Sequence, residues 1–174
     1  DDMQNMAMAY AVSKEKKREA VTEMIAELCV SGVNAIVKNE EHLQQIRSLF
    51  DLDGITIFSD RGSNLVCRNG NYMAEAPDGR PGFEDEGYLS LFGDDGIFVE
   101  SNMIKLRSQN PAAYAVTQEQ EIGAALQCLS RKEGIPYTMV NFEVFNRNRK
   151  WSDEDITLLT LLGHCIGNLL NYSE

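Results

Sequence analysis

The chain has 174 residues, of which 43% are hydrophobic and 8% aromatic, values typical of one globular domain with a substantial core. Its 27 acidic residues outnumber the 16 basic ones, which gives a formal net charge of −11. Because nucleic acids and anionic membranes are bound through a clustered positive field, this charge argues against both kinds of partner.

The cysteines and the N-terminal residues indicate a cytoplasmic fragment. Four cysteines, Cys29, Cys67, Cys128 and Cys165, form no C-x-x-C pair and are typical of reduced core residues. No segment has the roughly 18 uninterrupted apolar residues of a membrane span, and the start is not a signal peptide. The chain lacks an initiator methionine although helix-like sequence is under way at Met3, so we expect a piece of a longer protein.

The N-terminal part is predicted to be helical. Apolar residues at helical spacing indicate one long helix, or two consecutive helices interrupted near Ser31 and Gly32. The basic run Lys14–Arg18 is diluted by Glu15 and Glu19, and we interpret it as a solvated helix face. A short helix over Glu40–Phe50 follows, and we expect these helices to cover one side of a sheet.

The middle of the chain is predicted to contain a hairpin and then a long cover. A strand begins at Ile55–Phe58 and a second covers Leu65–Arg68, with a turn between them. Residues 69–96 are rich in Gly, Asp, Asn and Pro and contain one short apolar helix, Tyr88–Phe92. A segment of this length without strong regular structure is often a functional cover.

Three shorter elements follow the cover. Ile97–Val99 and Met103–Leu106 are predicted to be strands or short connections. Asn110 suits the N-cap of a helix that has Pro111 at its first position.

The C-terminal part carries the strongest local signals. Two strands, Glu121–Ser130 and Ile135–Phe145, are predicted to form a hairpin whose turn uses Gly134. In the last helix, Ser152 suits the N-cap and Asp155 lies three residues later, as in a capping box. Trp151 and Ile156 occupy the positions of a hydrophobic staple. Three further leucines widen the apolar stripe of this helix and indicate contact with a second copy of the chain: Leu158, Leu161 and Leu170.

The hairpin, the polar corner Asn146–Lys150, the run Trp-Ser-Asp-Glu-Asp from Trp151 and the Leu-rich last helix together resemble the second half of a GAF domain. Within that family they most resemble domains found upstream of GGDEF diguanylate cyclase modules in bacterial signalling proteins. The segments Gly87–Val99 and Asn102–Leu106 are similar to the middle of such domains, so the resemblance covers residues 43–170. It implies an α+β fold with a GAF-like (profilin-like) central antiparallel β-sheet, the N- and C-terminal helices on one face and a loop and helix cover on the other.

The resemblance also implies a function. Residues 39–172 would form a sensory domain that binds a small molecule, and residues 1–38 would form signalling or dimerisation helices. The partners would be a second copy of the chain and a downstream output module, without nucleic acid or membrane contact. Any diguanylate cyclase activity would lie in that module, so we expect this chain to be no enzyme. The alternative is a ligand-free GAF-like dimerisation or docking module.

Alternation along Ile135–Phe145 predicts the ligand site. One face carries Val140 and Phe142 and is a core face, whereas the other carries Asn141 and Glu143 and mixes apolar area with polar anchors, as a pocket wall does. If neighbouring strands alternate in the same sense, Thr56 and Leu129 also lie on this face, under a cover from Tyr72 to Phe92. The candidate ligand-binding residues are Phe58, Arg68, Tyr88, Phe92, Gln127, Met139, Asn141 and Glu143.

Two alternatives remain open for this face. Asn141 and Glu143 could point to solvent through a thin loop layer. The cavity could also be filled by the protein's own side chains, namely Phe58, Tyr88, Phe92 and Met139.

Other chemistry finds little support in the sequence. His164 and Cys165 are adjacent on a helix and point about 100° apart, so they cannot chelate one metal ion. Bilin-carrying GAF domains attach the chromophore through a Cys followed by a His, and here the order is reversed, so we expect no cofactor, no metal and no catalytic residue. A methionine-sulfoxide reductase on the same fold would need Cys67 and Cys128 to be neighbours on adjacent strands.

Overall fold

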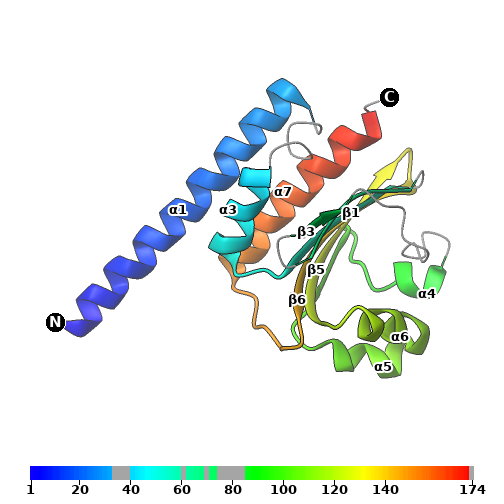
Figure 1. The fold of residues 1–174 in the computed structure, drawn as a ribbon. Helices are drawn as coiled ribbons and strands as arrows, with labels where there is room; N and C mark the ends of the chain where they lie inside the picture. Colours follow the sequence, from blue (N-terminus) through cyan, green and yellow to red (C-terminus); the bar gives the residue numbers. More distant parts are fainter. Residues whose placement is uncertain (33–39, 60–61, 69–70, 74–84, 173–174) are drawn as a thin grey trace.

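In the computed structural model, residues 1–32, 40–59, 62–68, 71–73 and 85–172 are described (Figure 1). Their strands form one antiparallel sheet with the order β3-β2-β1-β6-β5-β4. The strands are β1 (Gly54–Ser59), β2 (Gly62–Arg68), β3 (Asn71–Met73), β4 (Ile97–Glu100), β5 (Ile122–Lys132) and β6 (Ile135–Phe145). The long hairpin of β5 and β6 therefore lies between β1 and β4, near the centre of the sheet.

Helices cover both faces of this sheet (Figure 1). On one face lie α1 (Asp2–Ser31), α3 (Glu40–Phe50) and α7 (Asp153–Tyr172). On the other lie α4 (Glu86–Leu89), the 3₁₀ turn η1 (Met103–Lys105), α5 (Leu106–Gln109) and α6 (Pro111–Glu119). We call these the helix face and the cover face of the sheet, and the arrangement confirms the predicted α+β, GAF-like fold.

The turn between β5 and β6 fixes the register of the hairpin. Glu133 and Gly134 both have positive φ, 54° and 80°, which defines a type I′ turn. The right-handed twist of that turn matches the twist of the two strands it joins. Lys132 consequently pairs with Ile135, and Gln127 lies opposite Asn141.

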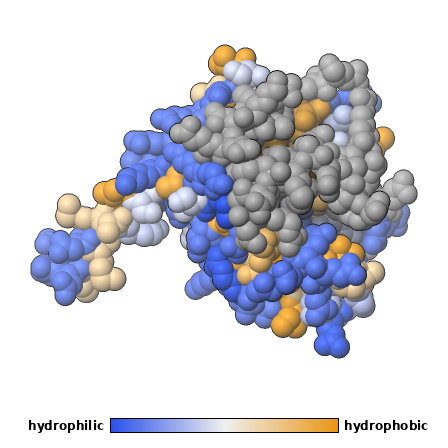
Figure 2. Space-filling model, in the orientation of Figure 1, coloured by the Kyte–Doolittle hydropathy of each residue, from blue (hydrophilic) through white to orange (hydrophobic). Residues whose placement is uncertain are grey.

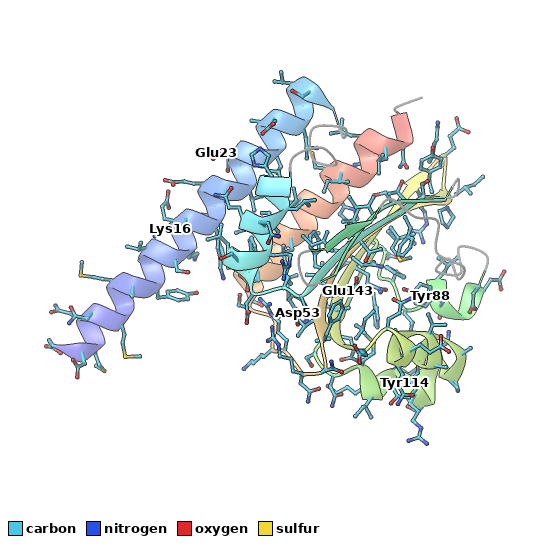
Figure 3. All side chains as sticks on the ribbon, viewed as in Figure 1. Lys16, Glu23, Asp53, Tyr88, Tyr114 and Glu143 are labelled. Carbon is cyan, nitrogen blue, oxygen red and sulfur yellow. The ribbon has the colours of Figure 1, made fainter. Side chains whose placement is uncertain are left out.

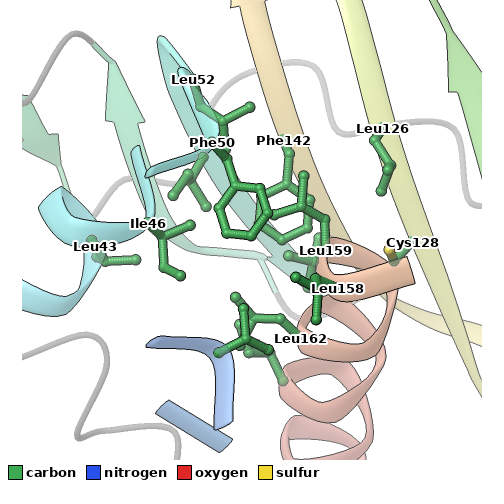
Figure 4. Close-up of a cluster of buried hydrophobic side chains, with 14 of the residues drawn as sticks. Leu43, Ile46, Phe50, Leu52, Leu126, Cys128, Phe142, Leu158, Leu159 and Leu162 are labelled. Atoms are coloured by element: carbon green, nitrogen blue, oxygen red, sulfur yellow. The ribbon is translucent and has the colours of Figure 1, made fainter. Parts of the chain in front are cut away.

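The helix face is covered by the larger apolar core (Figure 4). Phe50 from α3 and Phe142 from β6 are fully buried there with Leu159 and Leu162 from α7. Gly163 allows α7 to lie close to the sheet, because a Cβ at this position would come within 2.6 Å of Cys128 Sγ. This core is built from β1, β5 and β6 on one side and all three long helices on the other.

The start of α7 confirms the local prediction and adds a tertiary contact. Ser152 Oγ accepts a hydrogen bond from the Asp155 amide at 3.1 Å, so Ser152 is the N-cap. Trp151 and Ile156 both pack in the larger core. The Asp155 carboxylate accepts hydrogen bonds from Lys17 Nζ at 2.8 Å and from Arg149 Nη2 at 2.9 Å, so it joins α7 to α1.

The interpretation of Lys14–Arg18 as a solvated face holds for Glu15, Lys16 and Arg18, which are exposed, but not for Lys17. Lys17 pairs with Asp155 and has a side chain only 19% exposed, and Arg18 Nε lies 2.7 Å from Glu154 Oε1. Lys14 also reaches Glu154. The run is therefore the α1 side of an ion-pair cluster, which the sequence does not reveal because its acidic members lie at the start of α7.

The surplus leucines of α7 have two different roles. Leu158 is buried in the larger core and Leu170 packs against it, so both belong to this chain's own fold. Leu161 is 54% exposed. The first turns of α1 extend beyond the sheet and expose apolar residues, visible at the left of Figure 2: Met3, Met6, Met8, Tyr10 and Val12.

Several boundaries differ from the predictions. The short helix predicted at Tyr88–Phe92 begins at Glu86, because Asp85 accepts a hydrogen bond from the Tyr88 amide and caps it. Met103–Leu106 is helical, since Asn102 caps η1. The break near Ser31 and Gly32 is confirmed as the end of α1, whereas the first hairpin turn and most of the cover, residues 74–84, lie outside the described residues. Every helix in the described ranges is too short or too polar to cross a membrane.

Candidate functional site

Strand pairing aligns three rows of residues on the cover face of β1, β6 and β5. The pairings join Phe58 to Met139 and Leu129, Thr56 to Asn141 and Gln127, and Gly54 to Glu143 and Ala125. The first row is apolar, the second is polar, and the third combines one carboxylate with small residues. The rows extend the predicted alternation of β6 onto both of its neighbours.

The polar side chains of these rows are buried. Asn141 is 5% and Glu143 3% exposed, and Thr56 and Gln127 are equally enclosed. The alternative in which Asn141 and Glu143 point to solvent is therefore wrong. Burying an amide or a carboxylate is costly unless its polar atoms are bonded, so the contacts of each group decide what this site can do.

Two hydrogen bonds order the site. Thr56 Oγ1 donates to Glu143 Oε1 at 2.6 Å, which is a diagonal contact between the polar row and the next row. The Tyr88 hydroxyl donates to Gln127 Oε1 and lies 3.6 Å from Met139 Sδ. Tyr88 comes from α4, beside the sheet that carries Glu143 (Figure 3), so one cover residue is fixed to the polar row.

The Tyr88 hydroxyl is held in its protonated form. Burial raises the pKa of this phenol well above its ordinary value; the Gln127 hydrogen bond opposes the shift and the negative charge of Glu143 reinforces it. Tyr88 is thus a fixed hydrogen-bond donor, and its hydroxyl proton is already engaged in the hydrogen bond to Gln127 Oε1.

Asn141 Oδ1 is the exception in this network. It is buried and has no hydrogen-bond partner among the residues that the structure describes. An unpaired buried acceptor costs about 1–3 kcal/mol, and such groups are few in folded proteins. The orphaned oxygen lies in the middle row, between the Thr56–Glu143 contact on one side and Gln127 on the other.

The other half of the cover face is filled by aromatic and apolar side chains. The rings of Tyr88 and Phe92 meet edge to face with centroids 5.6 Å apart, and Phe92 lies 6.0 Å from Phe98. These rings form a second apolar cluster whose other buried members are Met103, Leu106, Ile122, Ala125, Leu129, Met139 and Phe145. Tyr88, Phe92 and Met139, three of the four residues named in the alternative of a filled cavity, belong to this cluster.

Seven of the eight candidate residues lie on the cover face. Phe58, Tyr88, Phe92, Gln127, Met139, Asn141 and Glu143 are all buried there. Arg68 pairs with Gly54, so its backbone lies in the row of Glu143, while its side chain is outside the described ones. The sequence placed Thr56 on this face but not among the candidate ligand-binding residues. Its hydrogen bond to Glu143 makes it part of the site. Phe98, whose ring lies 6.0 Å from that of Phe92, was not among the candidate residues.

A hollow lies away from the polar row, at the end of β5 and β6 opposite their turn. It has a volume of about 260 Å³ and is lined by residues of η1, α6 and the corner after β6, among them Met103, Tyr114, Gln118, Ile122 and Arg147. None of the residues that line it holds a buried, unpaired polar atom. The polar row is therefore the stronger candidate for a ligand site.

The described residues offer no support for metal or thiol chemistry at the sheet. They contain no group of three or more metal-ligating side chains. The expectation that Cys67 and Cys128 could be neighbours is wrong, because β1 and β6 lie between β2 and β5, about 14 Å in strand spacings. His164 contacts Asp95 O through Nε2 at 2.9 Å, which joins α7 to the turn before β4.

Comparison with solved structures identifies the fold. GAF3 from Slr1393 of Synechocystis sp. PCC6803, in its photoproduct state, matches with a TM-score of 0.52 at 12% identity, over 80% of this chain and 93% of that one. The chromophore-binding domain of a Stigmatella aurantiaca bacteriophytochrome matches with a TM-score of 0.58 at 15% identity, over 90% of this chain and 60% of that one. The GAF region of a putative membrane protein from Geobacter sulfurreducens PCA gives a TM-score of 0.50 at 13% identity, over 77% and 91%.

These similarities are at the level of the fold. No protein-family profile and no curated protein matches the sequence. The chain has the fold of a GAF domain, with the end helices and the cover on opposite faces of its sheet.

Proposed function

We propose that this chain is the sensory GAF-type domain of a cytoplasmic bacterial signalling protein and that it binds a small molecule at the polar row. The orphaned Asn141 Oδ1 is the observation that carries the proposal. A ligand that donates a hydrogen bond to this atom would remove the cost of leaving it unpaired, and the same ligand would meet a site already ordered by Thr56 and Tyr88.

The proposed ligand is rich in hydrogen-bond donors. Asn141 Oδ1 and the Glu143 carboxylate are acceptors, and the hydroxyl protons of Thr56 and Tyr88 are already donated within the protein. An N–H group on an apolar ring or chain would satisfy Asn141 Oδ1. The Tyr88 and Phe92 rings would contact the apolar part of such a molecule.

A covalently attached bilin does not fit this chain. One of the solved neighbours holds biliverdin and others are chromophore-binding domains. Here Cys29 and Cys165 lie on the helices of the opposite face, and Cys128 packs in the larger core. Cys67 pairs with Ile55 of β1, and its side chain is outside the described ones. We therefore propose a ligand held without a covalent bond.

The signal would pass from the sheet to the end helices. Helix α7 packs on β5 and β6, the strands whose other face carries Gln127, Asn141 and Glu143. A ligand that favours one arrangement of these rows would favour one position of α7 and of α1 beside it. Residues 1–38 would serve as signalling helices and residues 39–172 as the sensory domain. The exposed apolar residues at the start of α1, together with Leu161, support a dimer formed through these helices.

The output would be a diguanylate cyclase module of the GGDEF type, and this domain would not itself be catalytic. The resemblance of the hairpin, the polar corner and the last helix supports that assignment. A second candidate, a docking module without ligand, is favoured by the filled aromatic half of the cover face. The two functions differ in whether the polar row is occupied.

Native mass spectrometry of the purified protein tests the proposal. We expect a small mass that is retained under native conditions and lost on denaturation. The variant Asn141→Leu should lose this mass, whereas Asn168→Leu, the same change at an exposed position on α7, should keep it. A bare protein in all three samples would favour the docking module, and a monomer at tens of micromolar would contradict the dimer.

A further inference from the structure

Helices α1 and α7 run side by side in the same direction (Figure 1). An ion pair sets how far one is shifted along the other, because Arg18 Nε lies 2.7 Å from Glu154 Oε1. Cys29 lies eleven residues beyond Arg18, and Cys165 lies eleven residues beyond Glu154. The two cysteines therefore occupy equivalent positions further along the same pair of helices.

Eleven residues bring an α-helix back to nearly the same side. At about 100° per residue they make three turns and about 20° more, and they rise about 16 Å. Since Arg18 and Glu154 face each other, Cys29 and Cys165 face each other as well. Ile25 and Cys165 both pack against the larger core, which keeps the two helices together along this stretch.

The environment of Cys165 agrees with this placement. Burial raises the pKa of its thiol, and the neighbouring Cys29 thiol raises it further. This direction agrees with the facing of the two thiols that the helix geometry gives. Cys29 is exposed to solvent and Cys165 is partly buried, so a reagent reaches one thiol of the pair first.

We propose that Cys29 and Cys165 form a dithiol modification site that low-molecular-weight disulfides, such as oxidised glutathione, convert into an interhelical disulfide. The exposed Cys29 thiolate attacks the glutathione disulfide, forms a mixed disulfide and releases one glutathione thiolate. The Cys165 thiolate then attacks Cys29 Sγ and releases the second. The two protein thiols are oxidised, the glutathione disulfide is reduced, and the two thiol protons end on two molecules of glutathione.

The cross-link would fix α1 against α7. In the reduced protein the two helices are joined by ion pairs at the start of α7 and by core packing. A disulfide three turns further on would prevent them from sliding or rotating relative to each other. This site is independent of the polar row, so it can be tested whether or not a ligand binds there.

Incubation with oxidised glutathione, followed by alkylation and peptide mapping without reduction, tests the site. We expect a peptide pair joined through Cys29 and Cys165, an intact mass lower by that of two hydrogen atoms, and a higher Tm that dithiothreitol reverses. Glutathione that remains on Cys29, cross-linking between two chains, or the absence of any reaction would each overturn the proposal.

Three variants separate the two steps of the reaction. In Cys165→Ser the reaction should stop at the mixed disulfide between glutathione and Cys29. In Cys29→Ser neither the cross-link nor the rise in Tm should occur. Cys128→Ala is the matched control, because Cys128 is buried at the sheet and should leave the cross-link unchanged. A cross-link that forms equally well in Cys165→Ser would contradict the pairing.

Discussion

The two faces of the sheet are equally buried but chemically different. On β6 the helix face presents Val140 and Phe142, whereas the cover face presents Asn141 and Glu143, and all four are at most 5% exposed. The helix face gains free energy from apolar burial, which explains why its residues are there. The cover face buries polar groups at a cost, and one of them is unpaired. Burial alone therefore does not mark a functional residue, whereas the burial of a polar group without a hydrogen-bond partner points to one.

The largest expected effect lies on the helix face. Phe142→Ala would empty space at the centre of the larger core and lower the free energy of unfolding by about 3–5 kcal/mol, measured by urea denaturation. Phe92→Ala, on the cover face, should cost less because Phe92 is 8% exposed whereas Phe142 is 1% exposed. An equal loss of unfolding free energy in the two variants would contradict the expected difference in packing between the two faces.

Alkaline unfolding compares one buried acid from each face. Burial raises the pKa of the Cys128 thiol from 9.0 to about 12, with a further contribution from Asp95, and burial likewise raises the pKa of Tyr88 from 10.0. The unfolded chain therefore loses these protons first, so stability falls as pH rises from 9 towards 12. The slope is about 1.4 kcal/mol per pH unit for each group.

Variants assign this slope to the two faces. Cys128→Ala should reduce the slope between pH 9 and 10 to the contribution of Cys165, before Tyr88 begins to ionise in the unfolded chain near pH 10. Tyr88→Phe should reduce the slope above that pH. A pH profile of thermal or urea unfolding that neither variant changes would contradict the burial of both groups.

The smallest effects separate two polar residues within the cover face. Thr56→Val removes the donor to Glu143 Oε1 from a buried carboxylate, which should cost about 1–3 kcal/mol. Asn141→Leu removes the orphaned acceptor and should leave stability unchanged or raise it by up to about 1 kcal/mol. Urea denaturation measures both. A large loss in Asn141→Leu would show that Asn141 is a structural residue and would remove the support for a ligand.

The sequence predicted the features that depend on near neighbours. The N-cap at Ser152 and the turn at Gly134 involve residues only a few positions apart, and both are confirmed. Alternation along β6 also assigned Asn141 and Glu143 to the correct face. The signal in each case is local, because capping, turn geometry and the period of a strand are set within one short segment.

Features that depend on distant partners could not be predicted. Lys17 was interpreted as solvated because Asp155, its partner, lies 138 positions away. The orphaned state of Asn141 depends on which side chains lie beside it in the sheet, and β1 brings Thr56 there from far along the chain. Whether Leu158 or Leu161 is exposed likewise depends on where α1 packs on α7.

The long first helix is anchored at one end only, and this has a mechanical consequence. Its contacts with α7 and the core, from Lys14 to Leu28, span about 21 Å, while Met3 lies about 16 Å beyond the nearer end of that anchor. A stiff helix held in this way acts as a lever with a free arm. A tilt of α1 against the core would therefore move Met3 further than any anchored residue, so this arm can pass on a displacement that starts at the sheet.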